Sequence, residues 1–149
     1  MQIFIFQILA CFALALSAPA KAQSLSAPFT GTWSIDLRTP SERKEKVECG
    51  TAAFKLLQTG NRIIGSHSMA TARCGRLNDG GEGSVKGTVV GSTAVLTVTS
   101  ARNGQIVLGS AKIVGGSLHW QVSEEIKAGE QEGDSGLILQ SGVLRRERR

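Results

Sequence analysis

Histidine and cysteine are the side chains most often used for metal binding and nucleophilic chemistry, and this chain has only two histidines and three cysteines. His67 and His119 lie in separate predicted strands, and no carboxylate stands at the spacing that a metal site needs. Serine and aspartate are plentiful, yet no nucleophile elbow or similar signature selects one of them. We therefore expect no metal site, no cofactor and no enzyme activity.

The cysteines point to a structural role instead. Cys11 lies inside an N-terminal apolar run, which leaves Cys49 and Cys74 in the remainder of the chain. An even number of cysteines in an oxidising compartment favours a disulfide, and a tight turn near Asn61 would place Cys49 directly opposite Cys74 in a hairpin. A redox pair or a metal thiolate site lacks support, because there is no C-x-x-C motif. We predict a Cys49–Cys74 disulfide that contributes on the order of 3 kcal/mol to stability.

The N-terminus has the pattern of an export signal. Residues 3–16 are almost all apolar, a run too short to span a bilayer as a helix, and small residues follow with Ala20 and Ala22 at the A-x-A spacing. We expect cleavage after Ala22, with Ala20 as the alternative, so that 1–22 is the signal peptide and 23–149 the mature domain. Lipidation at Cys11 is a further alternative. The expected location is the periplasm or the exterior of the cell, without stable membrane insertion of the mature chain.

The elements beyond residue 22 alternate between apolar and polar residues and are separated by glycine turns, the pattern of half-buried β-strands. Only one stretch, 39–46, is predicted as a short surface helix or ordered loop. The basic run 145–149 is expected to be a solvated tail. Eight strands are predicted, at about 29–37, 49–58, 62–72, 84–90, 93–99, 105–114, 117–123 and 137–144.

Short connections between these strands force antiparallel neighbours, and an open sheet of this length would leave edges with few protecting charges. We therefore predict an all-β domain that forms a closed, up-and-down, eight-stranded antiparallel barrel, with a two-sheet β-sandwich as the alternative. Few aromatic residues remain beyond the signal peptide, and no tyrosine is present. Base-stacking platforms need aromatic rings, so nucleic-acid binding is not expected.

The sequence Phe29-x-Gly31-Thr32-Trp33, followed by an eight-stranded meander, resembles the calycin group of small barrels. This group includes lipocalins, avidins and bacterial inhibitors of secreted metalloproteases. The resemblance implies that Gly31 and Trp33 belong to the barrel floor. The lack of tyrosine departs from the avidin pattern, and no helix is visible to pack outside a lipocalin-like barrel. The metalloprotease inhibitors are similar in size, export and disulfide spacing, and they act through an extended N-terminal segment, here residues 23–28.

The predicted hairpin places His67 on the same face as the apolar residues, which would be the barrel interior. A one-residue slip would turn it outward, so an exposed or purely structural histidine remains an alternative. We expect non-enzymatic binding of a small apolar ligand, with an inhibitor or protein-partner role of the N-terminal segment as the alternative and a structural envelope role as the third. The predicted ligand-lining residues are Phe54, His67, Met69, Leu96 and Trp120.

Overall fold

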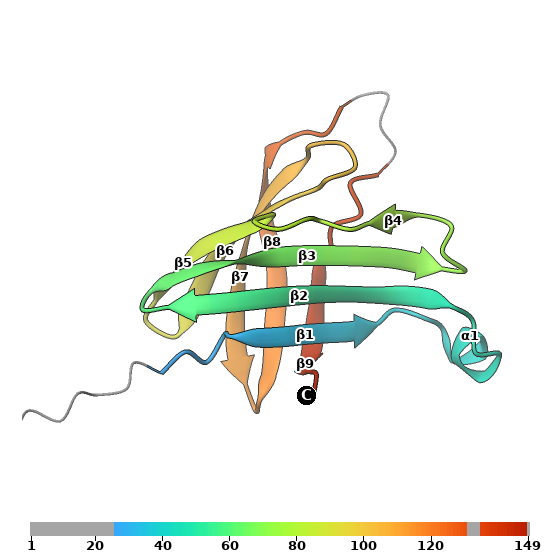
Figure 1. The fold of residues 1–149 in the computed structure, drawn as a ribbon, viewed down its shortest axis with the longest axis horizontal. Coiled ribbons are helices and arrows are strands. Elements are labelled where there is room, and N and C mark those ends of the chain that lie inside the picture. The colour runs from blue at the N-terminus through green and yellow to red at the C-terminus, as the bar shows by residue number, and fades with distance from the viewer. Residues whose placement is uncertain (1–25, 131–134, 149) are drawn as a thin grey trace, which may run out of the picture.

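The computed structural model describes residues 26–130 and 135–148; the predicted signal peptide and residues 23–25 lie outside this range. The regular secondary structure of the described chain is almost entirely β-strand (Figure 1). Nine strands and one short helix follow in the order β1 Gly31–Asp36, α1 Pro40–Lys44, β2 Cys49–Thr59, β3 Arg62–Ala72, β4 Leu77–Asn78, β5 Val85–Val90, β6 Thr93–Thr99, β7 Ile106–Val114, β8 Ser117–Lys127 and β9 Ser141–Arg146.

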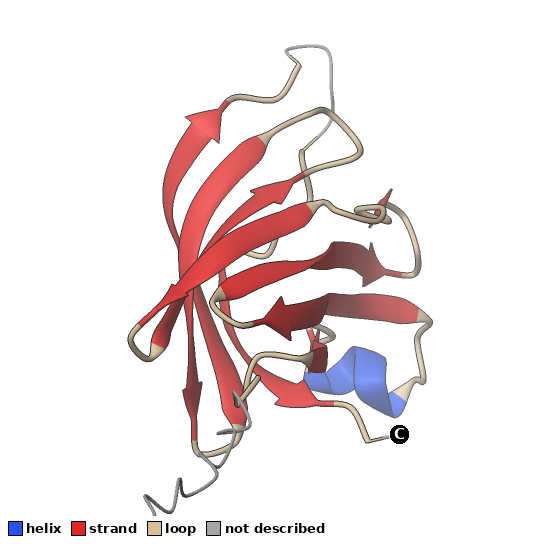
Figure 2. Cartoon of the chain, turned by 60° about the vertical axis from the view of Figure 1, so that its left-hand side comes forward, coloured by secondary structure: helices blue, strands red, loops and turns tan. Residues whose placement is uncertain are grey.

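The sheet closes on itself, as the strand pattern predicts. Every neighbouring pair is antiparallel, and the first and last long strands pair through Trp33 opposite Arg146 and Ser34 opposite Arg145. Eight strands therefore form a closed barrel, and β4 is a short addition beside β3. Figure 2 shows the strands curving round the enclosed core. Closure satisfies the backbone groups that an open edge would expose, and the β-sandwich alternative is wrong.

Alternation along each strand separates the core from solvent. In β2, for example, Ala52, Phe54 and Leu56 are buried, whereas Thr51, Lys55 and Leu57 are exposed or partly exposed. Burial of the inward apolar face supplies most of the free energy that offsets chain ordering. The exposed residue Thr39 caps α1, and Glu42 completes a capping box there. No helix in the described part of the chain is long and apolar enough to cross a membrane.

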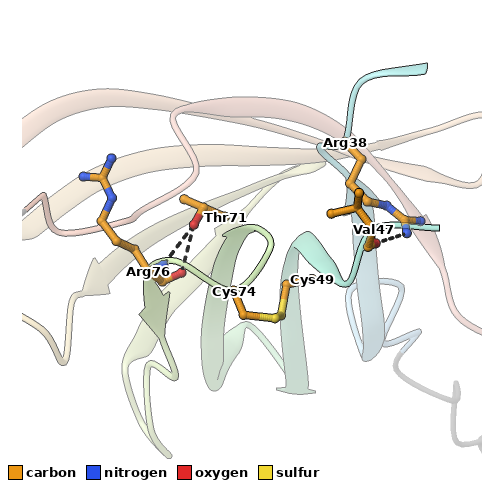
Figure 3. Close-up of a disulfide and its surroundings, with 6 residues drawn as sticks. All are labelled: Arg38, Val47, Cys49, Thr71, Cys74 and Arg76. Carbon is orange, nitrogen blue, oxygen red and sulfur yellow. Dashed lines mark hydrogen bonds between the residues drawn. A yellow bond between two sulfur atoms is a disulfide. The ribbon is translucent and has the colours of Figure 1, made fainter. Parts of the chain in front are cut away.

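The Cys49–Cys74 disulfide is present, with a Cα–Cα distance of 5.2 Å (Figure 3). The predicted register of the β2–β3 hairpin is wrong. Cys49 lies opposite Ala72, and Cys74 follows two residues later in a turn. The backbone amide of Arg76 donates to Thr71 Oγ1 at 2.9 Å, which helps to close this turn. Both cysteines have positive φ, so the backbone bends enough for the sulfur atoms to meet outside the strand pairing. A disulfide-bonded chain is compatible with an oxidising compartment.

The last third of the barrel differs most from the strand prediction. β8 continues to Lys127 through register shifts opposite β7, and β9 begins only at Ser141. Residues 137–140, predicted as the start of the last strand, are not in a strand. Leu137 has φ of 45°, a left-handed conformation that interrupts extended structure. This irregular segment matters for the site described next.

Candidate functional site

The two ends of the barrel are built differently. One end, here called the floor end, carries the tight turns after β2, β5 and β7, together with the start of β1 and the end of β9. The opposite end carries the longer connections, including the one between β8 and β9. Within that connection, Gly136–Gln140 is called the strap, and the end it covers the strap end. Loops and irregular segments on a rigid scaffold are the usual carriers of binding function.

Trp33 and Phe29 close the floor end. Both side chains are buried, and the indole Nε1 of Trp33 donates to the carbonyl oxygen of Phe29 at 2.9 Å. The backbone amide of Phe29 in turn donates to Gln58 Oε1 at 3.2 Å. Gly31, with φ of 140°, begins β1 next to this cluster in a conformation that favours glycine. The structure thus places the predicted floor residues together at one end.

Arg146 completes the floor, although the basic run 145–149 was expected to be a solvated tail. Its guanidinium lies 4.4 Å from the centroid of the Trp33 ring and donates to the carbonyl oxygen of Pro28 at 2.6 Å. Cation–π attraction and this hydrogen bond tie the last strand to the segment before the first. The side chain stays exposed while it covers the ring. Neither charge nor spacing distinguishes Arg146 from its basic neighbours in sequence.

The strap closes the other end by inserting apolar side chains into the core. Leu137, Ile138 and Leu139 are consecutive and all buried, and the last two belong to the main hydrophobic cluster. A strand would alternate such residues between two faces, but an irregular segment can bury all three. The run of apolar residues is the signal that made the segment look like a strand.

Side chains from opposite walls of the barrel hold the backbone of Leu139. Its amide donates to His67 Nε2 on β3 at 3.3 Å, and its carbonyl oxygen accepts from Trp120 Nε1 on β8 at 2.7 Å. Three strands separate β3 from β8 in either direction round the barrel, so these anchors face each other across it. The Leu139 peptide units therefore span the interior, and their polar groups are paired by side chains instead of by a sheet.

Asn78 on β4 provides the second attachment of the strap. Its buried Nδ2 donates to the carbonyl oxygens of Gly136 and Leu137, both at 3.1 Å. Its Oδ1 accepts from the amides of Gly80 and Ala101, at 3.1 and 3.2 Å. One side chain thus joins three connections of the strap end. Asn78 could not be recognised from the sequence, because asparagine in a glycine-rich loop is common and gives no local sign of long-range contacts.

His67 lies in the interior, as the predicted face of β3 implies, and the exposed alternative is wrong. The side chain is fully buried, and desolvation lowers its pKa to about 4. Its Nε2 accepts from Leu139, whereas its buried Nδ1 has no hydrogen-bond partner among the described residues. The ring therefore carries a polar atom that the described residues leave unsatisfied, a rare arrangement that calls for a physical reason.

The predicted ligand-lining residues come together in the core. The Phe54 ring lies 4.7 Å from His67 and 5.1 Å from Trp120, between centroids. Leu96 is fully buried in the same cluster, and Met69 packs against it while staying partly exposed. Gly109 leaves room for the indole, because a Cβ there would approach Trp120 Cη2 to 2.4 Å. Glycine at this position of β7 thus has a packing role.

A shallow groove of about 1310 Å³ runs over the outer surface, away from this cluster. It crosses β1, β2 and β3, where Leu57 and Ile64 are register partners and both exposed, and it reaches Arg146 at the floor end. His119 is also exposed on the outer surface. In residues 26–130 and 135–148 no three histidine, cysteine, aspartate or glutamate side chains gather as metal ligands would.

The site is thus an aromatic and aliphatic interior that contains one neutral histidine and is covered by an irregular strap. This arrangement can hold an apolar group and offer it a single polar contact. Comparison of the chain with models of known protein families, with curated proteins and with solved structures found no significant match.

Proposed function

We propose that this protein is an exported, non-enzymatic binding module that takes up a small apolar ligand at the strap end. The observation that carries the proposal is the strap itself. Its apolar residues Ile138 and Leu139 occupy the core, yet its backbone is attached through the side chains of His67, Trp120 and Asn78. Residues 136–139 can therefore leave without breaking the barrel ladder, while the carbonyl oxygen of Gln140 stays bonded to the Val122 amide on β8.

The energetics favour exchange of the strap for a ligand. A typical hydrogen bond contributes only about 0.5–1.5 kcal/mol net, so the anchoring bonds hold the strap modestly. Displacing Ile138 and Leu139 would leave an apolar volume next to Phe54 and Trp120. A ligand of similar volume restores the buried apolar contacts there. Because it binds only when these side chains are displaced, it shifts the equilibrium between the closed and the displaced strap toward the displaced state.

Binding of a fluorescent apolar probe tests the proposal. N-phenyl-1-naphthylamine should increase its emission with the mature domain, residues 23–149, and neutral lipids that compete for the site should displace it. Asn78→Ala loosens the strap and should strengthen probe binding. Asn61→Ala changes an exposed turn at the floor end and serves as the matched control. A domain that binds neither the probe nor any member of a lipid and metabolite panel, with Asn78→Ala equally inert, would refute the ligand role.

A second candidate is the binding of an exported protein partner, such as a secreted protease, through residues 23–28. One observation favours it: residues 26–28 are exposed, and the chain then enters the outer groove at Thr30–Thr32. Deleting residues 23–26 keeps the Arg146 contact with the Pro28 carbonyl. Loss of protease inhibition upon this deletion, with probe binding unchanged, would support the partner role over the ligand role.

A further inference from the structure

His67 has an unpaired polar atom in the interior of the protein. The side chain is fully buried, Nε2 is used by the strap, and Nδ1 has no partner within the described chain. Leaving a buried polar group unpaired is unfavourable, because the group has lost its hydrogen bonds to water. Buried polar groups of native proteins are nearly always paired, so an atom left unpaired by the described residues calls for a further partner.

The hydrogen bond from the Leu139 amide to His67 Nε2 determines whether Nδ1 lacks a donor or an acceptor. Nε2 accepts the amide proton of Leu139, so it carries no proton itself. A neutral imidazole has one protonated nitrogen, which must then be Nδ1. The unpaired atom is thus an N–H donor. It requires a hydrogen-bond acceptor.

We propose that the ligand of the strap end is an apolar molecule with a neutral hydrogen-bond acceptor, such as a ketone, ester or amide carbonyl, which accepts from His67 Nδ1. This inference rests on the proposed ligand role and adds the chemical class of the ligand. The apolar body lies against Phe54, whose ring neighbours the imidazole, and against Trp120, whose ring neighbours Phe54. The carbonyl oxygen supplies the acceptor that the described residues do not provide for Nδ1.

A carboxylate fits the same place less well. No lysine, arginine, aspartate or glutamate side chain in the described residues is buried, so an anionic group would have only His67 as a counter-ion. Pairing would require a second proton on the imidazole, whose charged form is opposed by desolvation. A neutral acceptor avoids this cost, because it accepts from the imidazole in the neutral form that already has its proton on Nδ1.

The test compares two ligands that differ in one group. 2-Undecanone and 2-methyl-1-undecene have nearly the same shape, but only the ketone accepts a hydrogen bond. Dissociation constants for the wild-type domain at pH 7.5 are measured by displacement of N-phenyl-1-naphthylamine and corrected for each compound's partition between water and hexadecane. We expect the corrected affinity to favour the ketone roughly tenfold or more, the equivalent of one hydrogen bond to a buried donor. Undecanoate should bind more weakly than the ketone.

Two variants separate recognition of the carbonyl from the hold on the strap. His67→Phe keeps an aromatic ring, removes Nδ1 and should abolish the preference for the ketone. Trp120→Phe removes the other anchor of Leu139 but leaves Nδ1 in place, so it should retain the preference. If His67→Phe does not fold, the ¹⁵N-coupled Nδ1 proton of wild-type His67 gives a second readout, since it should shift on addition of the ketone and not of the alkene.

The outcomes distinguish the inference from the function on which it rests. Equal corrected affinities for ketone and alkene would leave the ligand role standing and overturn the carbonyl inference, as expected if a buried water satisfies Nδ1. Stronger binding of undecanoate than of the ketone would also overturn it. If neither compound displaces the probe and the Nδ1 resonance does not respond to either, the inference is wrong, and failure of the probe itself to bind would remove the ligand role as well.

Discussion

The floor end and the strap end close the same barrel by different means. At the floor end, Trp33 belongs to a strand of the closed sheet, and Phe29 and Arg146 pack around it. At the strap end, the closing segment belongs to no strand, and side chains hold its backbone. The comparison teaches that opening the floor end breaks strand pairing, whereas opening the strap end breaks side-chain hydrogen bonds and exposes the buried apolar residues of the strap.

The two ends are nevertheless linked through a row of side chains. Trp33 on β1, Phe54 on β2 and His67 on β3 are successive register partners across three neighbouring strands. Phe54 therefore lies between the floor cluster and the histidine that holds the strap. A change in packing at one end can therefore reach the other end through the Phe54 side chain. The predictions below test how independent the two ends are.

Removal of the floor indole should have the largest effect. Trp33→Ala deletes a fully buried ring and leaves the Phe29 carbonyl without its donor, so we expect a loss of about 3–5 kcal/mol in the free energy of unfolding. Urea denaturation followed by circular dichroism measures it. Trp33→Phe keeps part of the ring and should lose less. A loss below 1 kcal/mol for the alanine variant would contradict a closed floor.

Acid should weaken the strap end before the floor end. The pKa of His67 is lowered from 6.5 to about 4. Below pH 6.5 the unfolded chain therefore binds a proton at His67, whereas the folded protein binds it only when the pH falls to about 4. Stability present above pH 6.5 is therefore lost between pH 6.5 and 4, by on the order of 3 kcal/mol. Hydrogen bonds from Arg38 lower the pKa of Asp36 to about 2, so the stability linked to Asp36 is lost only at lower pH.

Urea titrations at several pH values measure this loss. His67→Phe should flatten the profile between pH 6.5 and 4, and His119→Gln, which removes an exposed histidine, should leave it as in the wild type. Backbone amides of the strap should exchange with solvent faster at pH 4.5, relative to the intrinsic rate, while the Trp33 amide stays protected. Simultaneous loss of protection at both ends would mean that the barrel unfolds as one unit.

Loosening the strap attachment should have a smaller and more local effect. Asn78→Ala leaves the carbonyls of Gly136 and Leu137 without their donor, and we expect a loss of about 1–3 kcal/mol in global stability. Hydrogen exchange should show the amide of Leu139 deprotected by a larger factor than any amide of β1. A uniform loss of protection over the whole barrel would argue against a separately opening strap.

The smallest effect is expected at the exposed side of the floor. Arg146→Gln removes the cation over Trp33, and glutamine reaches the Pro28 carbonyl less well. Because the guanidinium is exposed, we expect a loss of about 1 kcal/mol. Arg148→Gln, further along the exposed tail, is the control and should change the midpoint of urea denaturation little. Comparable losses for the two variants would show that general charge, and not the Trp33 contact, stabilises this end.

The sequence predicted the parts of the fold that depend on short-range pattern. Alternation placed the β2–β3 hairpin and put Phe54 and His67 inside, because a strand repeats every two residues whatever its partners. It failed at the strap, where Leu137 turns out of the extended conformation and three adjacent residues are buried together. It also misjudged the alignment of Cys49 with Cys74, which depends on turn geometry instead of alternation.

The contacts that complete the site depend on distance across the fold. Asn78 reaches Gly136, and Arg146 reaches Pro28, over separations of 58 and 118 residues. Such a pair leaves no local trace, since each residue looks like an ordinary loop or tail residue on its own. The five lining residues could be predicted because the sequence shows the order of the strands and which face of each strand is apolar. The strap that covers these residues has no such pattern, so it could not be predicted.

The contact between Pro28 and Arg146 has a practical consequence for handling the molecule. It brings the start of the folded chain and its last strand to the same end of the barrel. An affinity tag or fusion partner at either terminus therefore emerges at the floor end, and a molecule immobilised by its C-terminus presents the opposite mouth to the solution. A short linker could also join the N-terminus of the folded chain to its C-terminus. New termini could then be opened at the Gly115-Gly116 turn, as circular permutation requires.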